Sequence, residues 1–403
     1  MTDQVIILGD GAAGLSMALA MAKANKHVTL IGANKTPADR NLGGVQMAAN
    51  GWSALSELGC DAAVWEHAKR LELMRIMSLA NGHSLVSIPL DEQHRRQPYA
   101  SVTRHGLITS LAAAVAAAPC ITHVTATATH IESHADQAVV IDSDQRSYKA
   151  DWVFGADGMM GLCRQYVDGG DKITPNKITP NKITPNKITP RRTSRYATRF
   201  HVPLDTLPPV LASASTSVWL GRMGHMVHYP LTDGHLNLVV MTHDSNDGDD
   251  ENRQAQRWAS VMSLIAAHPW LDSADQNLAR ENAYMMPLQS WPRCDSWIRG
   301  RVVVTGDSAH QMPPHLAQGT GQALIDAASL SRMLSGGMAM TDAIPAWAGM
   351  RMRRIRSVLA SAEQAGNLFA PPPILSPVRD IMVGLGGMAI MPRILDKIWS
   401  DQL

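Results

Sequence analysis

A glycine-rich turn around residue 11 restricts the fold more than any other feature of this sequence. The turn reads Gly9-Asp10-Gly11-Ala12-Ala13-Gly14 and follows the apolar run Val5–Leu8, which has the composition of a buried parallel strand. Residues 12–24 are rich in Ala, Leu and Met, which favour a helix, and residues 27–31 are again strand-like. This order predicts a right-handed βαβ unit with a parallel sheet.

Each glycine of this turn has a separate physical role in binding a dinucleotide. Gly9 makes the tight turn, Gly11 lets the backbone approach a pyrophosphate, and Gly14 lets the helix pack closely on the sheet. The helix that begins beside Ala13 directs its free N–H groups toward the phosphates. We therefore predict a dinucleotide site at Gly9, Gly11, Ala13 and Gly14.

Two residues depart from the usual pattern of such a site. Asp10 places a carboxylate beside the phosphate turn, which is unfavourable unless the side chain points away. The second strand normally ends in Asp or Glu, which binds the adenosine ribose, but here that position is Gly32, followed by Ala33-Asn34. The ribose contact must therefore be weaker or come from elsewhere in the chain.

A second glycine loop follows a strand predicted at residues 301–305. It begins Gly306-Asp307, contains Pro313-Pro314, and reaches Gly319, where a helix to about residue 334 begins. Asp307 can accept a hydrogen bond from a cofactor hydroxyl, and the helix N-terminus at Gly319 can stabilise negative charge in front of it. On the residues alone, a plain loop between a strand and a helix stays the alternative.

The length of the chain predicts two or three lobes. Its 403 residues are 45% hydrophobic and 18% charged, which is typical of a soluble globular protein. A net charge of +1 gives no electrostatic case for a nucleic-acid partner. Residues 196–241 read as β-structure, with strands at 225–229 and 236–241 joined by a turn at 232–234. Further helices are predicted at 106–118 and 347–365.

Disulfides, metal sites and membrane spans are not expected. The four cysteines lie far apart and form no CxxC pair, so we expect reduced thiols in a cytoplasmic protein and no metal site: Cys60, Cys120, Cys163 and Cys294. No signal peptide and no apolar run of about 20 residues is visible. The apolar segment Ile381–Met391 is expected to pack on the protein, with a peripheral membrane contact as the alternative.

One segment has an unusual five-residue repeat. Residues 172–190 read KITPN three times and then KITP. Proline removes a backbone donor in every unit, so neither a helix nor a central strand can run through the repeat. We predict a surface loop over residues 166–195, with a ligand for a partner protein as the alternative.

Three motifs together resemble those of the class A flavoprotein monooxygenases, the p-hydroxybenzoate hydroxylase fold group. They are the glycine turn, the sequence Gly155-Ala156-Asp157-Gly158 with Arg164 six residues on, and Gly306-Asp307. The stretch Gly43–Gln46 resembles the loop after the second strand in that family. The resemblance implies FAD as cofactor and an α/β fold, in which a Rossmann-like FAD-binding domain carries an inserted β-sheet substrate domain and a C-terminal helical part.

The same resemblance divides the chain into segments. The expected segments are FAD-binding at 1–70, 101–165 and 295–345, substrate-binding at 71–100 and 196–294, the repeat loop at 166–195, and helices at 346–403.

Within this group the chain is most similar to the branch of salicylate hydroxylase and 6-hydroxynicotinate 3-monooxygenase, over residues 225–231 and 312–319. In that branch a His and a Tyr four residues apart face the substrate ring, which implies His225 and Tyr229 as catalytic residues. Positions i and i+4 of a strand share one face. An imidazole of near-neutral pKa can take a phenol proton. His228 alternates to the other face and is expected to be structural.

The resemblance also implies cofactor contacts at Gln46, Arg104 and Asp307, with Pro314 and Gly319 in the same loop as Asp307. Asp157 is expected to shape its own loop and is counted among the cofactor residues. His310 is expected to support the site without reacting. Three positions depart from the family pattern and leave the substrate open: Gln46 for His, Gln311 for Pro, and Ile325 for Glu.

The implied activity is hydroxylation of a small aromatic or heteroaromatic phenol. It uses O₂ through a flavin C4a-hydroperoxide, and NADH or NADPH as a transient electron donor, in a monomer or homodimer. One alternative is an FAD-dependent reductase or oxidase without oxygen insertion. Another is a degenerate flavoprotein that serves as a binding module, which Asp10, Gly32 and the repeats would favour.

Overall fold

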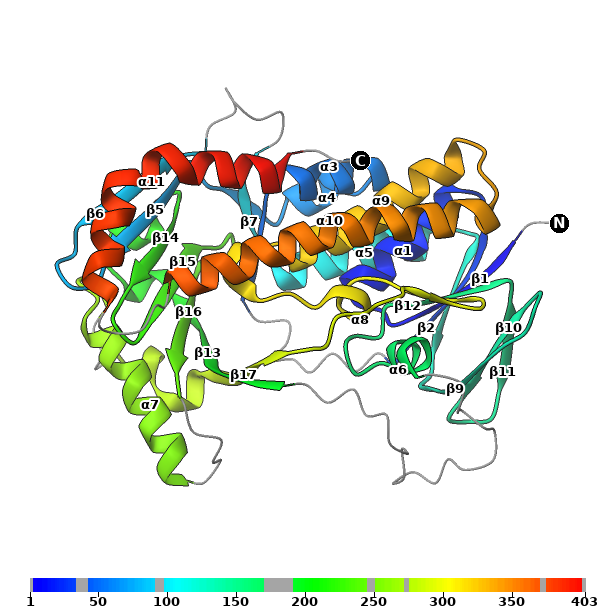
Figure 1. Cartoon of the computed structure of the whole chain (residues 1–403), viewed down its shortest axis with the longest axis horizontal. Helices are drawn as coiled ribbons and strands as arrows, with labels where there is room; N and C mark the ends of the chain where they lie inside the picture. The colour runs from blue at the N-terminus through cyan, green and yellow to red at the C-terminus, as the bar shows by residue number, and fades with distance from the viewer. Residues whose placement is uncertain are drawn as a thin grey trace.

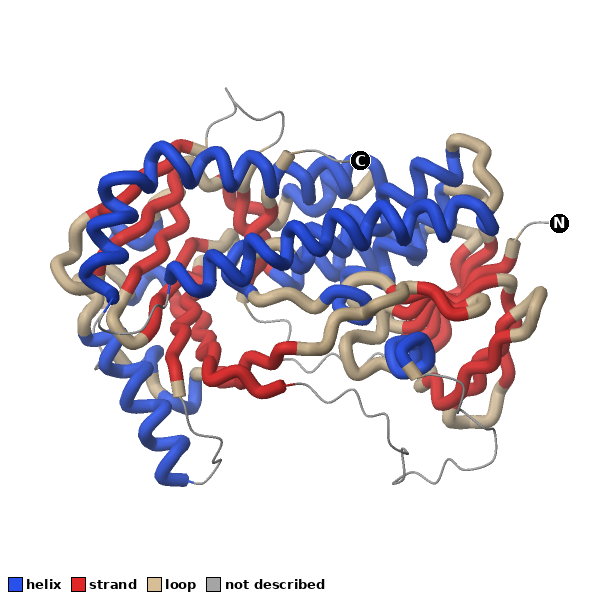
Figure 2. The backbone as a smooth tube through the Cα atoms, in the orientation of Figure 1, coloured by secondary structure: helices blue, strands red, loops and turns tan. Residues whose placement is uncertain are grey.

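The computed structural model describes residues 3–33, 43–90, 98–169, 191–244, 251–271, 275–369 and 375–400. The KITPN repeats at 172–190 lie outside the described residues. Figures 1 and 2 show two groups of strands at opposite ends of the molecule, with the longest helices running along one side between them.

The first group is a six-stranded sheet with the order β18-β19-β12-β1-β2-β8. Strands β1 and β2 are parallel, with Val5 opposite Val28, and helix α1 connects them, so the predicted βαβ unit is confirmed. Only the edge pair β18–β19 is antiparallel among the described strands of this sheet. The elements are β1 Gln4–Leu8, α1 Ala12–Lys23, β2 His27–Gly32, α5 Arg104–Ala117, β8 Ile121–Thr125, β12 Trp152–Gly155, β18 Ile298–Arg299, β19 Val302–Val304 and α9 Gly319–Ser335.

The second group is a seven-stranded sheet with the order β17-β13-β16-β15-β14-β5-β6. The predicted hairpin is confirmed, because β15 and β16 are antiparallel, with Val227 opposite Val239. Strands from an earlier part of the chain complete this sheet, since β5 pairs in parallel with β14. The strands are β5 Leu73–Ser78, β6 Ser84–Pro89, β13 Arg191–Pro203, β14 Ser215–Leu220, β15 Gly224–Pro230, β16 His235–His243 and β17 Tyr284–Ser290.

Two small sheets lie beside the larger ones. One has the order β3-β7-β4 and connects the two groups of strands, and the other has the order β11-β10-β9. Their strands are β3 Gly44–Met47, β4 Ala68–Arg70, β7 Ala100–Thr103, β9 Ala128–Ser133, β10 Ala138–Asp142 and β11 Ser147–Ala150. The shorter helices are α3 Ala49–Leu58, α4 Asp61–Trp65, α6 Leu162–Asp168, α7 Glu251–Ala266 and α8 Asp307–His310.

Two long helices follow α9. Helix α10 covers Met340–Phe369, longer than predicted, and α11 covers Ser376–Trp399 over β6 (Figure 1). Val383 and Leu395 of α11 are buried, so one face of this helix packs on the protein, whereas Ile381, Met382 and Leu385 are exposed. The prediction for Ile381–Met391 therefore stays open between packing and a peripheral membrane contact. Among the described helices, none has the length and apolar character that crossing a membrane requires.

The hydrophobic core is divided in the same way as the sheets. The largest cluster fills the space between the six-stranded sheet and helices α1, α5, α9 and α10. The seven-stranded sheet has two separate clusters, one shared with α7 and one shared with α11. The two larger sheets therefore have separate hydrophobic cores. The boundary between two such units is a common place for a ligand site.

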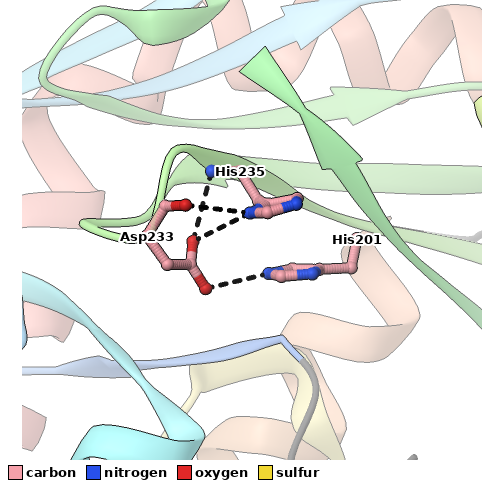
Figure 3. Close-up of side chains that lie close together, drawn as sticks. All are labelled: His201, Asp233 and His235. Atoms are coloured by element: carbon pink, nitrogen blue, oxygen red, sulfur yellow. Dashed lines mark hydrogen bonds and ion pairs between the residues drawn. The ribbon is translucent and has the colours of Figure 1, made fainter.

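The hairpin turn between β15 and β16 carries a partly exposed group of His and Asp side chains (Figure 3). Asp233 contacts His201 Nε2 at 3.1 Å through its carboxylate and His235 Nδ1 at 3.0 Å through its backbone oxygen. The two imidazole rings stack with their centres 3.9 Å apart. The spacing of the sequence did not reveal this group, because His201 comes from β13 and the other two residues from the hairpin.

Candidate active site

The glycine turn fits a bound pyrophosphate. Gly9 has a φ of +103°, and a Cβ there would lie 2.7 Å from the carbonyl carbon of Ala156. A Cβ on Gly14 would lie 2.9 Å from the carbonyl carbon of Gly9, so both positions require glycine for packing. A Cβ on Gly11, in contrast, would meet no described atom within 4 Å. Gly11 therefore faces open space at the N-terminus of α1, where a phosphate can approach the N–H groups of the helix.

The Gly306-Asp307 loop lies directly beside this turn. Gly306 has a φ of +57°, and a Cβ there would lie 2.7 Å from the Cβ of Ala13. The N–H of Gly306 donates to Asp326 Oδ2 at 3.1 Å, and this hydrogen bond ties the loop to helix α9. Asp307 itself is exposed at the start of α8, so its carboxylate is available to a ligand.

A buried ionic cluster holds the Gly306-Asp307 loop in place. The carboxylate of Asp326 is fully buried and lies 2.6 Å from His310 Nε2 and 2.7 Å from Arg351 Nε. Burial alone would raise the pKa of Asp326, but the charges of His310 and Arg351 hold it well below its usual range. His310 therefore supports the loop through Asp326, as predicted for a residue that does not react.

Asp157 connects the two loops through its side chain. Its carboxylate accepts hydrogen bonds from the N–H of Cys163 at 3.0 Å and from the hydroxyl of Ser308 at 3.2 Å. Burial raises the pKa of Asp157 to about 6, although these hydrogen bonds oppose the shift. These contacts give Asp157 the loop-shaping role that we expected, and its role as a cofactor residue stays a prediction.

A cavity of about 360 Å³ brings most of the remaining candidates together. One wall comes from the cofactor motifs and the other from the seven-stranded sheet. Gly9, Gly14 and Asp157 are not part of this lining. The predicted residues that line the cavity are Gly11, Ala13, Gln46, Arg104, His225, Tyr229, Asp307, Pro314 and Gly319.

The wall from the seven-stranded sheet is a single face of alternating residues. His225 and Tyr229 lie on it together, as the i and i+4 spacing predicted, and His228 lies on the other face. There the Nε1–H of Trp219 donates to His228 Nε2 at 3.0 Å, which gives His228 its expected structural role. The other residues of the cavity face are Ala197, Arg199, Val227, Val239, Met241, Met286 and Leu288.

Tyr229 lines the cavity, but its hydroxyl already forms a hydrogen bond within the protein. The hydroxyl donates to the carbonyl oxygen of Gly44 at 2.9 Å, and the N–H of Gly44 donates to Asn237 Oδ1 at 3.2 Å. Burial raises the pKa of Tyr229 to about 12, so the hydroxyl stays protonated. Tyr229 therefore fixes the substrate sheet to β3 and forms a wall of the cavity.

His225 has a much lower pKa than the near-neutral value that we expected. Burial is the largest cause that lowers the pKa of His225 to about 3, and charge repulsion from His315, Arg195 and Arg379 acts in the same direction. Its Nδ1 is buried and has no hydrogen-bond partner among the described residues. The ring is consequently a neutral imidazole with a nitrogen available to a ligand.

Arg199 was not among the residues predicted for the site. This residue lies on β13 beside Ala197, lines the same cavity, and has a buried Nε without a hydrogen-bond partner in the described part of the chain. Tyr196, three residues earlier on β13, lies on the other face, and the guanidinium of Arg257 stacks over its ring. The alternation along β13 was the one signal for Arg199, and no motif marked it.

A second, larger cavity of about 990 Å³ adjoins the first. The two share Leu288, Asp307, Pro313, Pro314 and His315, so the segment that begins at Asp307 separates them. Trp291 and Arg195 contribute to the lining of the larger cavity. The cofactor loop can thus be reached from two sides.

The fold and this site define a flavoenzyme in which a Rossmann-like domain and a β-sheet domain enclose one cavity. The model of the FAD binding domain family, FAD_binding_3, matches residues 2–342. The chain belongs to this family, and FAD is its cofactor. Gly11 and the N-terminus of α1 would hold the pyrophosphate, and Asp307 would hold a hydroxyl of the flavin chain.

Curated relatives and solved structures agree with this assignment. The chain is 26% identical to 3-hydroxybenzoate 6-hydroxylase of Klebsiella oxytoca over 94% of this chain and 92% of the relative. It is 25% identical to salicylate hydroxylase of Pseudomonas putida over 99% and 92% of the two chains. Klebsiella pneumoniae HpxO with FAD and uric acid shares the fold, with a TM-score of 0.82 and 18% identity over 99% and 97%. The chain is accordingly an FAD-dependent monooxygenase of the aromatic hydroxylase type.

Proposed function

We propose that this enzyme hydroxylates a small aromatic or heteroaromatic phenol that also carries a negative charge. The observation that carries this proposal is a set of three buried, unpartnered nitrogens in the described cavity: Arg199 Nε, His225 Nδ1 and His315 Nδ1. Buried polar groups normally have partners, so three such groups in one cavity indicate a polar ligand. A guanidinium binds a carboxylate especially well.

The division of labour follows from the two walls of the cavity. When bound, FAD supplies the oxygen activation and receives its electrons from NADH or NADPH. Arg199 binds the anionic group of the substrate, and His225 Nδ1 forms a hydrogen bond with the phenol hydroxyl. The apolar side chains of Val227, Val239 and Met241 exclude water from the ring. The free N–H groups at the start of α9 stabilise negative charge on the cofactor.

Substrate charge also changes the basicity of His225. In the free protein the pKa of His225 lies at about 3, which is too low for a general base. An anion bound in the same cavity favours the imidazolium form, so it raises the pKa of His225. Proton transfer from the phenol is thereby coupled to the binding of the correct substrate.

The substrates after which the relatives are named support this substrate class. 3-Hydroxybenzoate and salicylate each combine a phenol with a carboxylate. The departures at Gln46, Gln311 and Ile325 leave the individual compound open.

The first test is an absorption spectrum of the purified protein, followed by NADH and NADPH oxidation with hydroxybenzoates and hydroxypyridines. We expect a flavin spectrum, oxidation stimulated by an anionic phenol, and an oxygenated product. Stimulated oxidation that yields only hydrogen peroxide or reduced substrate for every compound would favour the alternative of a reductase or oxidase.

Substitution of Arg199 tests the substrate charge. Arg199→Gln should raise the KM for the carboxylate substrate by about tenfold or more, since a hydrogen bond to a charged group is lost. Arg199→Lys keeps the charge and should lose less. The matched control is the neutral amide of the same substrate, whose KM should stay within about twofold. Equal losses for the acid and the amide would contradict a carboxylate at Arg199.

Two further expectations accompany the proposal. A cytoplasmic location and a monomer or homodimer stay predictions. Fractionation of cells and light scattering of the purified holoenzyme measure them directly.

A further inference from the structure

The end of β2 has no side chain, yet a carboxylate occupies the space beside it. A Cβ built on Gly32 would lie 2.6 Å from the Cβ of Asp10 and would overlap the Asp10 carboxyl group. The side chain of Asp10 therefore fills the position that a residue-32 side chain would take. The present position of the Asp10 side chain requires glycine at 32, because any larger residue there would displace it.

The direction of the Asp10 side chain explains how its carboxylate comes to lie beside Gly32. Asp10 follows β1, but its Oδ2 lies 3.7 Å from His123 Nε2 on β8, and β2 lies between β1 and β8 in the sheet. The side chain thus crosses the end of β2. The N–H of Gly9 donates to the carbonyl oxygen of Ile31 at 2.8 Å and holds the turn against this strand end. About a quarter of the Asp10 side chain is exposed, with a relative accessibility of 23%, so a ligand can reach it.

We propose that Asp10 replaces the acidic residue missing from the end of β2 and binds the hydroxyls of the adenosine ribose of FAD. In βαβ units the ribose is bound by a carboxylate at this strand end. Here the carboxylate reaches the same place from the first loop of the motif. Asp10 and Gly32 each suggest a degenerate site when taken alone. Together they provide the carboxylate that a ribose site requires.

The first test compares two flavins on the apoprotein by fluorescence quenching. Asp10→Asn should raise the Kd for FAD by about tenfold or more, because a charge-assisted hydrogen bond is weakened. The Kd for FMN, which has no adenosine, should stay within about twofold. If Asp10 merely repels the pyrophosphate, Asp10→Asn would tighten FAD binding, and this result would overturn the proposal. An equal weakening of FAD and FMN would overturn it as well.

The second test moves the carboxylate back to the strand. Gly32→Glu alone should weaken FAD binding, since the two side chains compete for one space. The double variant Asp10→Ala/Gly32→Glu should recover the wild-type Kd within about threefold, while Asp10→Ala alone should not. A double variant that binds FAD no better than Asp10→Ala would refute the exchange of roles.

His123 provides the matched control. His123→Gln removes the ion pair but keeps the carboxylate of Asp10, so the Kd for FAD should change by less than about twofold. A loss as large as that of Asp10→Asn would mean that the ion pair, not ribose binding, is the role of Asp10. Thermal unfolding of each apoprotein distinguishes loss of binding from loss of folding.

Discussion

Two buried histidines of this enzyme differ in their surroundings. His310 lies 2.6 Å from Asp326, whose carboxylate also binds Arg351 and the N–H of Gly306. His225 is equally buried, but His315 and positively charged arginines surround it, and its Nδ1 has no partner in the described residues. Both rings have an Nδ1 without a hydrogen-bond partner in the described residues, so the difference between them is one of charge. In the first arrangement the carboxylate of Asp326 balances its cationic neighbours and is complete in that sense, whereas only cationic neighbours act on the pKa of His225. A complete cluster stabilises the fold, whereas an incomplete one awaits a ligand.

The largest effect should come from breaking the complete cluster. Asp326→Ala leaves Arg351 and His310 buried without a counter-charge, so we expect a loss of about 3–5 kcal/mol in the free energy of unfolding. Urea denaturation of the apoprotein measures this loss. The Gly306-Asp307 loop loses its anchor at the same time, and FAD affinity should fall. A loss below about 1 kcal/mol would show that the cluster does not hold the loop.

Breaking the incomplete cluster should affect turnover. His225→Ala should retain FAD and slow hydroxylation by about 10²-fold or more, as expected for a lost proton acceptor. His228, three residues on, is the matched control, because its ring accepts a hydrogen bond from Trp219 on the opposite face. His228→Ala should lower stability and leave the rate of folded enzyme within a few-fold. Unchanged turnover of His225→Ala would remove His225 from the site.

Acidification should distinguish the two clusters without any mutation. Burial lowers the pKa of His225 to about 3 and that of His228 to about 4, from 6.5. The unfolded chain therefore binds more protons below pH 6.5, and stability should fall as the pH drops from there toward 4. The pKa of Asp326 is also lowered, so its contribution is complete above the unfolded value of 3.8 and is lost only at lower pH.

The fluorescence of Trp219, which is fully buried against His228 and His268, should report this acid transition. Burial lowers the pKa of His268 to about 2, so His268 contributes in the same direction. We expect the seven-stranded sheet to unfold at a higher pH than the six-stranded sheet. His228→Gln should move the transition to lower pH, and an unmoved transition would contradict this assignment.

The sequence predicted the FAD side of the molecule better than the substrate side. Gly9, Gly11 and Gly14 could be assigned because each backbone role requires glycine, and the apolar runs around them fixed the βαβ unit. Arg199 could not be found, because an arginine on a strand carries no pattern until its face is known. The pKa of His225 also depends on residues distant in sequence, His315 and Arg379, that only the fold brings together.

Asp10 and Gly32 show the same limit within the cofactor motif itself. Each departs from the pattern, and each taken alone reads as a defect. Their compensation depends on a side chain that crosses a strand, which no spacing rule describes. Sequence patterns thus identify a site whose functional residues stand at the usual positions. They miss a site in which a residue at another position takes over the function.

The exposed cluster at the hairpin turn should give the smallest effect. Asp233→Asn weakens an ion pair with His201 that solvent reaches, so the free energy of unfolding should change by less than about 1 kcal/mol. Burial and the neighbouring His235 already lower the pKa of His201, and Asp233 opposes them. The substitution should therefore lower the pKa of His201 further, which an NMR titration of the imidazole protons measures. A stability loss near that of Asp326→Ala would mean that burial does not separate these clusters, and the contrast between His310 and His225 would then need another cause.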